Sequence, residues 1–418
     1  MEPMHAVHKI LARAAGKDYV KAGQIIMARV DVAGVNDIYP QVVHSFRAMG
    51  ARKVFAPEKI VFIFDHHAPP ATVSAADNQK MMRDFCQELG IENLTDINAG
   101  ICHQVLVEGG FSRPDRLMVV TDSHSTSHGA LGAFSTGVGA TDMAGVLVSG
   151  ELWLRVPEVV LVEFTGTLPP GVMAKDLALF LLGRLGTRFA LYKTLEFAGE
   201  VIDRMPTAER MVLCNMAVEM GAKAAYIAPD AETYSYLQEK AGLGLQGEAF
   251  QTDPGFAYEA VYPFDVSELE PLVACPHGVD RVTPVSQLAP VAVNQAFIGS
   301  CIGGRLEDLA VAAEVLRGRS LAPGVRLLVT PSSTRELQEA MARGYIQDLL
   351  AAGATLATPG CGACCGVHLG LIGAGEVCVT ASARNFRGRM GSNDSQVYVA
   401  SPRTVALAAL QGYLGTGS

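Results

Sequence analysis

The chain has 418 residues, 49% of them hydrophobic and 18% charged, which is enough apolar sequence to build the cores of two or three domains. Its formal net charge of −9, without a long run of Lys or Arg, argues against nucleic acid as a partner. The apolar runs are short and the N-terminus lacks a basic-then-apolar pattern, so we expect neither a membrane span nor a secretory signal. Nine scattered cysteines, an odd number, are typical of a reducing cytoplasm.

In the first third of the chain, residues 59–64 and 116–121 are apolar and rich in β-branched side chains. Such runs predict strands that are buried on both faces, as in a parallel sheet. Each run ends in a polar cluster, Asp65 and His66 after the first and residues 122–129 after the second. This is the place where open α/β sheets bind ligands. We expect helices over residues 4–15, from an Asn36–Asp37 cap to Arg47, over 78–89 and over 100–108.

A glycine-rich stretch, residues 132–142, follows the second polar cluster. A turn of this kind can hold a phosphate at the start of a helix. Its spacing matches neither the P-loop nor the dinucleotide fingerprint, however. We therefore expect a tight helix–sheet contact here rather than a nucleotide site.

The middle of the chain begins with a predicted strand over residues 159–164, after a break at 155–157. A helix is expected over residues 209–221. Asn215 and Glu219 are four residues apart in it and would share one face. A polar pair in an apolar helix is either a satisfied structural pair or a pair that faces a cavity, and the spacing leaves both open.

The last third repeats the pattern of a short strand followed by a polar or thiol-bearing turn. The helix over residues 305–317 is amphipathic, and Ser333 with Glu336 predicts a capping box for the next helix. The expected strands cover residues 296–299, 325–330, 354–358 and 376–381. Abundant Gly and Ala with few aromatic residues also favour an α/β fold. We predict three α/β domains, over residues 1–157, 158–276 and 277–418.

Three cysteines lie in glycine-rich turns. Cys361 and Cys364 are spaced Cys-x-x-Cys, so neighbouring thiolates can hold one metal centre, and Cys301 is a candidate third ligand. Glycines allow backbone N–H groups to approach a bulky inorganic group. Three protein ligands with one open position are typical of a catalytic centre, whereas four close it. A structural zinc half-site and a redox pair are the alternatives.

Seven stretches, taken together and in this order, resemble the aconitase superfamily, specifically the large subunits of its two-subunit isopropylmalate dehydratase and homoaconitase type. The stretches are residues 64–67, 101–104, 121–125, 214–219, 299–301, 359–364 and 384–391. They cover nearly the whole chain. The resemblance implies α/β domains of the aconitase type, packed around an iron–sulfur site, in a cytoplasmic protein.

The resemblance also implies roles for individual residues. A 4Fe–4S cluster, with one iron not ligated by protein, would be held by Cys301, Cys361 and Cys364. The implied catalytic residues are Asp65, His66, His103, Asp122, His124 and Glu219. The implied substrate-binding residues are Ser123, Arg384, Arg389 and Asn215, the last of them beside the cluster. These types suit the chemistry, because an open iron is a Lewis acid, an imidazole can protonate a leaving hydroxyl, and arginine binds carboxylates.

The function implied is that of a hydro-lyase or isomerase that dehydrates and rehydrates a small hydroxy di- or tricarboxylate, with 3-isopropylmalate as the first candidate. Homoaconitate and 2,3-dimethylmalate chemistry are the alternatives. A small subunit would supply a swivelling domain and a serine base. Three positions depart from the family: Ile302 and Gly303 stand where Thr and Asn are usual, and Ala383 where Asn is usual. They support a different hypothesis, a non-catalytic binding or regulatory member of the fold, and a zinc scaffold is a third.

Overall fold

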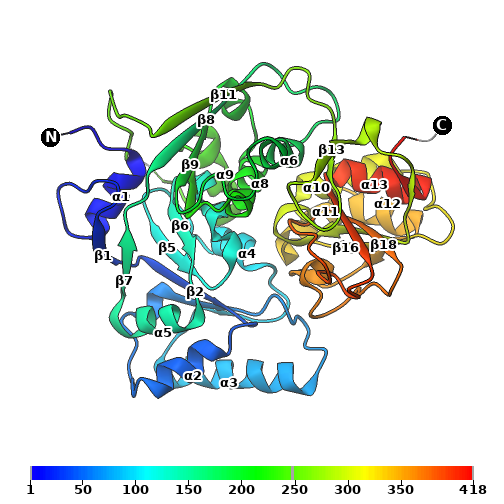
Figure 1. Ribbon diagram of the computed structural model, residues 1–418. Helices are drawn as coiled ribbons and strands as arrows, with labels where there is room; N and C mark the ends of the chain where they lie inside the picture. The colour runs from blue at the N-terminus through cyan, green and yellow to red at the C-terminus, as the bar shows by residue number, and fades with distance from the viewer. Residues whose placement is uncertain (1, 246–248, 417–418) are drawn as a thin grey trace.

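The structure is a computed structural model and describes residues 2–245 and 249–416. The predicted α/β class is confirmed. Three sheets that are wholly or largely parallel follow one another along the chain, with two small antiparallel pairs beside them. Figure 1 shows the last third of the chain lying beside the first two thirds.

The first sheet is entirely parallel, in the order β4-β3-β2-β5-β6. Its strands are β2 (Val32–Asn36), β3 (Ile60–Ile63), β4 (Leu94–Thr95), β5 (Leu117–Val120) and β6 (Phe134–Gly137). The helices of this region are α1 (Ala6–Ala14), α2 (Gln41–Ala48), α3 (Val73–Leu89), α4 (Cys102–Glu108) and α5 (Ala140–Ser149), and η2 (Ser123–Leu131) is a 3-10 helix. Every residue of β3 and β5 is buried, as predicted.

One expectation for this region was wrong. Pro40, not Asn36 or Asp37, is the N-cap of α2, because residues 37–39 form a turn and the side chain of Asp37 faces elsewhere. The glycine-rich stretch, where a tight helix–sheet contact is expected, contains strand β6 and the start of α5. Gly137, at the end of β6, fits because an added Cβ would lie 2.7 Å from the carbonyl oxygen of Asp122.

The second sheet is also parallel, in the order β10-β9-β8-β11. Its strands are β8 (Val159–Thr165), β9 (Thr194–Ala198), β10 (Ala224–Tyr226) and β11 (Ala260–Asp265), and its helices are α6 (Ala174–Leu185), α7 (Glu200–Asp203), α8 (Thr207–Met216) and α9 (Ala231–Ala241). The predicted helix over residues 209–221 is wrong in its last turns. It leaves α-helical geometry after Met216 and continues as the 3-10 turn η3 (Ala217–Met220), so Asn215 and Glu219 do not share an α-helical face.

The third sheet has the order β13-β12-β19-β18-β15-β16-β17. Its strands are β12 (Leu272–Ala274), β13 (Val282–Pro284), β15 (Gln295–Gly299), β16 (Arg326–Thr330), β17 (Thr355–Leu356), β18 (Val377–Thr380) and β19 (Gln396–Ala400), and its helices are α10 (Leu306–Leu316), α11 (Thr334–Ala342), α12 (Tyr345–Ala352) and α13 (Pro402–Gln411). Strand β12 pairs within this sheet although it lies before residue 277, where the third domain was predicted to begin. The division into three domains stays a prediction.

The capping box predicted for α11 forms only in part. The Ser333 hydroxyl accepts from the Glu336 N–H at 3.1 Å. The Glu336 carboxylate, however, accepts from the Leu306 N–H at 2.6 Å and pairs with Lys240 at 2.8 Å. Glu336 therefore links α11 to α10 and α9, and its side chain does not cap the N-terminus of α11.

Main-chain contacts tie the first third of the chain to the last. The Ile101 N–H donates to the Ser332 carbonyl at 2.8 Å, and Gly100 bridges to Ser333. Gly100 is required here, because its φ is +138° and an added Cβ would lie 2.4 Å from the Ser332 oxygen. One buried apolar cluster also runs from Ile101 to Val399. The two regions are therefore packed as one body.

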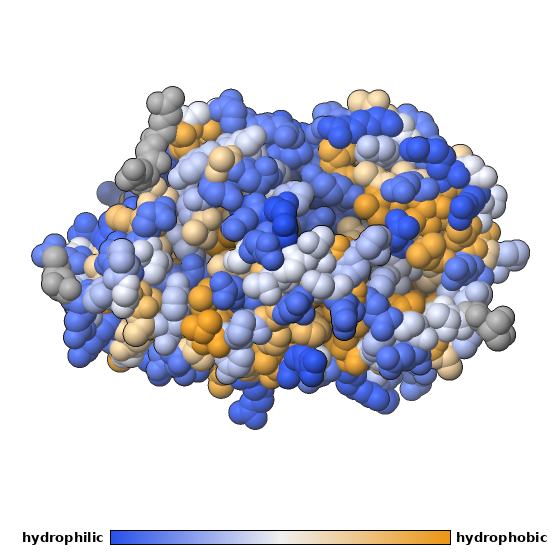
Figure 2. All heavy atoms as spheres, turned by 90° about the horizontal axis from the view of Figure 1, so that it is seen from above, coloured by the Kyte–Doolittle hydropathy of each residue, from blue (hydrophilic) through white to orange (hydrophobic). Residues whose placement is uncertain are grey.

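The surface carries one exposed apolar face on the antiparallel pair β1 (Ile25–Arg29) and β7 (Glu151–Arg155). Met27 pairs with Trp153 there, and both side chains are more than half exposed. Figure 2 shows the molecule from above, relative to the view of Figure 1. A hollow lies near the middle of this face, with hydrophilic side chains along its edge. Within the described ranges, no helix is long and apolar enough to cross a bilayer.

Candidate active site

The three predicted cysteine ligands come together at the ends of two strands of the third sheet. Cys301 lies in η5 (Ser300–Ile302), directly after β15, and Cys361 with Cys364 lies at η6 (Gly362–Cys365), after β17. All three are at most 5% exposed. The Ser300 hydroxyl lies 3.9 Å from the sulfur of Cys301 and 3.9 Å from that of Cys361, so two of the thiols face the same small volume.

Hydrogen-bond donors surround these sulfurs. The Asn215 amide donates to Cys301 Sγ at 3.2 Å, and the Arg389 guanidinium donates to Cys364 Sγ at 3.4 Å. Hydrogen bonding from Cys361 lowers the pKa of Cys364 well below its usual range, and Arg389 acts in the same direction. Two nearby buried atoms, Arg389 Nε and Asn215 Oδ1, have no hydrogen-bond partner within the described chain. A set of thiols facing mostly donors fits an electron-rich sulfur-containing group.

Cys365 lies close to this set, although no ligand role was predicted for it. Its sulfur is 3.8 Å from that of Cys361. With His66 and Cys361 it forms a group whose ligand atoms all lie within 4.8 Å of one another. The zinc and redox alternatives therefore have residues of the right kind at this place.

Asp65 and His66 extend from the carboxyl end of β3 toward the cysteines. Asp65 Oδ1 accepts from His66 Nδ1 at 2.7 Å, and its Oδ2 accepts from the Cys102 N–H at 2.8 Å. The Asp65 carbonyl accepts from the Cys361 N–H at 2.8 Å. Burial opposes protonation of His66, but the Asp65 carboxylate outweighs it and raises the pKa of His66 well above its usual value.

Asp37 was missed as a site residue by sequence reasoning. Its carboxylate accepts from the N–H groups of His66 and His67, at 3.0 Å each, and from the Gln79 side chain at 3.0 Å. This buried carboxylate therefore fixes the loop that carries the Asp65–His66 pair. Only its place in the sequence, directly after an apolar strand, could have indicated such a role.

Asp122 connects three imidazoles. Its Oδ1 lies 2.9 Å from His103 Nε2 and 3.4 Å from His124 Nδ1, and its Oδ2 lies 3.7 Å from His66 Nε2. The His124 N–H also donates to it, at 2.7 Å. Burial alone would raise the pKa of Asp122, but the bonds from His103 and His124 lower it well below its usual range. Asp122 is therefore an anion that holds imidazoles from two elements, α4 and η2.

Glu219 links the second sheet region to the third. Its Oε1 lies 3.0 Å from His124 Nε2 and accepts from Arg384 Nε at 2.7 Å. Burial alone would lower the pKa of His124, yet its bonds to Asp122 and Glu219 raise it. Asn215, one turn earlier, instead donates to Cys301, so one member of the predicted pair contacts a thiol and the other an imidazole.

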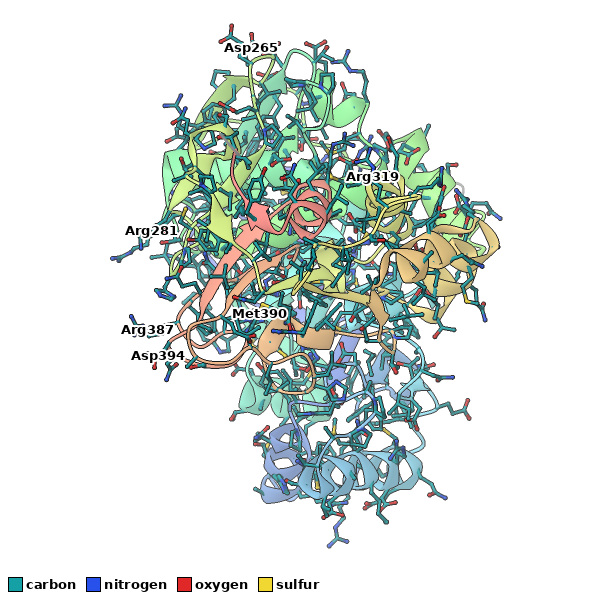
Figure 3. All side chains as sticks on the ribbon, turned by 90° about the vertical axis from the view of Figure 1, so that its right-hand side faces the viewer. Asp265, Arg281, Arg319, Arg387, Met390 and Asp394 are labelled. Atoms are coloured by element: carbon teal, nitrogen blue, oxygen red, sulfur yellow. The ribbon has the colours of Figure 1, made fainter. Side chains whose placement is uncertain are left out.

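The loop after β18 carries both predicted arginines. Arg384 is 24% exposed by its side chain, and Arg389 is partly buried. In Figure 3 Arg387 and Asp394 point outward from this loop, whereas Met390 lies toward the interior. Lys175 of α6 was missed by sequence reasoning. It fixes the start of this loop, because its ammonium donates to the carbonyls of Ala381 at 2.7 Å and Ser382 at 3.1 Å.

The three positions that depart from the family pattern lie beside the thiols. Ile302 and Ala383 are buried in the same apolar cluster as Cys301, Cys361 and Cys364. Gly303 presses against the end of β18, since an added Cβ would lie 2.6 Å from the Ala381 Cβ. The wall of the thiol site is therefore apolar at residues 302 and 383, and the turn at Gly303 lies close to Ala381.

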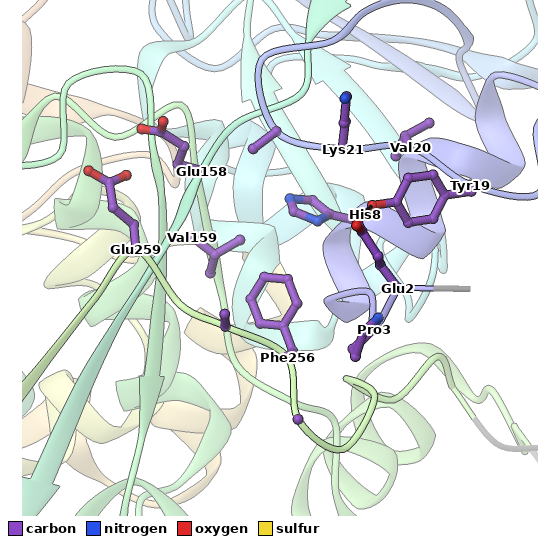
Figure 4. Close-up of a pocket in the computed structure, with 13 residues that line it drawn as sticks. Glu2, Pro3, His8, Tyr19, Val20, Lys21, Glu158, Val159, Phe256 and Glu259 are labelled. Atoms are coloured by element: carbon purple, nitrogen blue, oxygen red, sulfur yellow. Dashed lines mark hydrogen bonds between the residues drawn. The ribbon is translucent and has the colours of Figure 1, made fainter.

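A separate pocket of about 430 Å³ lies between α1 and the start of β8 and contains none of the predicted site residues (Figure 4). His8 lies at its centre, with Phe256 beside it and Glu2 and Tyr19 along one side. Burial lowers the pKa of His8 to about 4, so this imidazole is neutral at physiological pH. The chemistry-bearing groups therefore gather at the strand ends described above.

Comparisons with known proteins show the family of this chain. The model of the family described as Aconitase family (aconitate hydratase) matches residues 8–293 and 286–412. The chain is 48% identical over 405 residues, 97% of its length and 96% of the relative's, to a protein of Methanopyrus kandleri named 3-isopropylmalate dehydratase large subunit 1. It is 44% identical, over 99% of its length and 97% of the relative's, to a probable methanogen homoaconitase large subunit of Methanothermobacter thermautotrophicus.

Among solved structures, the chain resembles the holo-form of aconitase X from Thermococcus kodakaraensis, with a TM-score of 0.51 and 14% identity. The match covers 91% of this chain and 89% of that one. At this identity the likeness shows a shared fold.

Proposed function

Because this chain belongs to the aconitase family, we propose that it is the large subunit of a hydro-lyase that removes and re-adds water on a small hydroxy acid with two or three carboxylates. The first candidate substrate is 3-isopropylmalate, after relatives at 42–48% identity that carry that name. One observation carries the proposal: the Asp65 backbone bonds to Cys361 while its side chain bonds to His66, so acid–base and thiol groups share one site.

The family implies an iron–sulfur cluster, and we propose a 4Fe–4S cluster held by Cys301, Cys361 and Cys364. The fit is supported by the donors that face these sulfurs, Asn215 and Arg389, and by the unpartnered Arg389 Nε. When bound, such a cluster supplies a Lewis acid at its iron that lacks a protein ligand. Cys365 is a neighbour in this arrangement and not a ligand.

The chain's own residues would manage protons and carboxylates. His66, protonated through its Asp65 partner, holds a proton for a leaving hydroxyl and presents Nε2 toward Asp122. His103 and His124 are oriented by the same carboxylate, and His124, whose pKa is raised, is a second group that can hold a proton for the reaction. Arg384 donates through Nε to Glu219, which leaves its terminal N–H groups for a substrate carboxylate, and Ser123 offers a hydroxyl at the start of η2.

We further propose that a small subunit covers this site and supplies a swivelling domain with a serine base, and that the complex works in the cytoplasm. The large-subunit names of the relatives support a partner of this kind. All nine cysteines are free thiols in the structure, which supports a reducing compartment.

The test is an anaerobic assay of the reconstituted chain, with and without the small subunit, against 3-isopropylmalate, homoaconitate and 2,3-dimethylmalate. We expect turnover of 3-isopropylmalate only with the partner. Full turnover by the chain alone would contradict the partner, and a brown protein inert toward every acid would favour a non-catalytic member. A colourless protein with stoichiometric zinc would favour a scaffold. Preference for homoaconitate would favour a homoaconitase large subunit, the second candidate, which is supported by the relatives of that name.

A further inference from the structure

A pocket of about 340 Å³ adjoins the acid–base residues and has no role in the proposed chemistry. Asp122 and Ser123 form part of its wall, so it opens directly beside the position where substrate is expected. The opposite wall comes from the end of β6, the start of α5 and the turn that carries Lys223. Three features of that wall favour a negatively charged guest.

The first feature is the start of α5. This helix has ten residues, its N-cap is Gly139, and no side chain caps it. An added Cβ on Gly139 would meet no atom within 4 Å, so the space in front of the helix is open. Uncapped N–H groups and the helix dipole attract anions. Asp142 in the first turn is exposed and does not line the pocket.

The second feature is Lys223, which lines the pocket and is half-buried. Its N–H donates to the Lys193 carbonyl at 2.8 Å, which fixes the turn. Its ammonium forms no ion pair with any described residue. The centroid of the Tyr192 ring lies 5.6 Å from Nζ, and the charge of Asp142 acts on the ammonium without pairing with it. Burial lowers its pKa, which indicates an ammonium that lacks sufficient compensation.

The third feature is Thr136 of β6, which is 2% exposed yet lines the pocket. Its hydroxyl makes no hydrogen bond within the described part of the chain. The two other threonines of the wall are engaged: Thr121 donates to Asn36 Oδ1 at 2.7 Å and Thr126 donates to the Asn215 carbonyl at 3.2 Å. The Thr136 hydroxyl is therefore free to donate to a guest in the pocket.

We propose that Lys223, Thr136 and the start of α5 form a carboxylate-binding subsite adjoining the catalytic residues. The negative charge of Asp122 does not oppose this, since His103 and His124 already donate to it. The inference rests on the proposed function in one respect, that the substrate is a small polycarboxylate. The carboxylate bound is either the far end of a longer substrate or a separate small acid, and both present the same group.

The experiment uses a matched pair of unreactive ligands that differ at one end. Butane-1,2,4-tricarboxylate and isopropylsuccinate are both substituted succinates, the first with a carboxyethyl arm and the second with an isopropyl arm. Binding of each to the anaerobically reconstituted full chain is measured by calorimetry for the wild type, Lys223→Met and Lys223→Arg. Lys193→Met is the control, a nearby lysine whose ammonium already pairs with Glu259.

We expect Lys223→Met to weaken the tricarboxylate about tenfold or more, Lys223→Arg to restore it, and isopropylsuccinate to change less than twofold. The Lys193 variant should leave both unchanged. A second arm titrates glutarate onto the chain saturated with isopropylsuccinate, and a Lys223-dependent second equivalent assigns the subsite to a separate acid.

Equal effects on both succinates, or no dependence on Lys223 in either arm, would overturn the subsite. These outcomes are distinct from failure of the proposed function. In that case isopropylsuccinate does not bind the wild type and 3-isopropylmalate is not turned over, while glutarate alone still tests Lys223.

Discussion

The site contains two regions that differ in their hydrogen bonding. On the side of the first sheet, the carboxylates of Asp37, Asp65 and Asp122 accept hydrogen bonds from imidazoles and backbone N–H groups. On the side of the third sheet, Asn215, Ser300 and Arg389 face sulfur atoms, and two polar atoms, Asn215 Oδ1 and Arg389 Nε, have no hydrogen-bond partner within the described residues. The carboxylate–imidazole network is therefore formed by residues of the chain itself, whereas the thiols and the donors around them fit an electron-rich guest. The imidazoles are held in place without that guest.

The largest effect should come from breaking the thiol region. We expect Cys361→Ser to lose the cluster and to lower kcat/KM roughly a thousandfold, because Lewis-acid stabilisation of several kcal/mol is removed. Iron and sulfide content and visible absorbance measure the loss. Cys365→Ser, which changes the neighbouring thiol, should keep both the colour and most of the activity. Equal loss in the two variants would mean that Cys365 is a ligand.

The next largest effect should come from the acid–base region alone. Asp122→Asn replaces the anion that holds His103 and His124 with a neutral amide. We expect kcat to fall about a hundredfold, within the usual contribution of positioned acid–base groups. Iron content and circular dichroism should stay at wild-type values, because Asp122 bonds to imidazoles and not to the proposed cysteine ligands. A variant that lost its iron would show that the two regions are not separable in this way.

A smaller effect, on pH dependence, tests whether Glu219 couples the regions. His124 has a raised pKa, through its bonds to Asp122 and Glu219, and it must be protonated to act as an acid. Activity is then present below that pKa and is lost as the pH rises through it. Glu219→Gln removes one supporting charge, so the alkaline limb of the kcat/KM profile should move to lower pH. Glu314→Gln, an exposed change on α10, should leave the profile in place.

The smallest effect expected is on stability. In Asp37→Asn an amide nitrogen would replace one oxygen and face the His67 N–H and the Gln79 amide, so donors would oppose donors. We expect the free energy of unfolding to fall by about 2 kcal/mol, as for buried groups left without a partner. Urea unfolding of the cluster-free chain, followed by circular dichroism, measures it. The exposed control Asp84→Asn, which loses a surface pair with Lys80, should change it by less than about 0.5 kcal/mol.

The sequence predicted what is local. Buried strands ending in polar clusters placed Asp65 and Asp122 correctly at the carboxyl ends of β3 and β5, because an apolar run and its end are both read from neighbouring residues. The roles assigned to these residues came from motifs and stay predictions. What could not be predicted depends on distance in space: Asp37 serves N–H groups about 30 positions later, and Lys175 reaches carbonyls more than 200 positions away.

Element assignment from the sequence is limited in a similar way. The glycine-rich stretch has no strand pattern, yet β6 forms there, paired in parallel with β5, and Gly137 allows the Asp122 carbonyl oxygen to lie close. The apolar pattern of residues 209–221 reads as one helix, but Glu219 must meet both His124 and Arg384, and the chain tightens into η3 before it. The periodicity of apolar residues indicates which residues are buried. It does not indicate the contacts that a polar residue makes with distant parts of the chain.

The main-chain bond from Cys361 to Asp65, with the Gly100–Ser333 bridge, has a kinetic consequence. Main-chain contacts between the two regions oppose a hinge movement at the place where a substrate is expected to enter. If the proposed small subunit covers this opening, entry and release of the acids would depend on movement of that subunit. The rate of turnover would then be a property of the complex rather than of the flexibility of this chain.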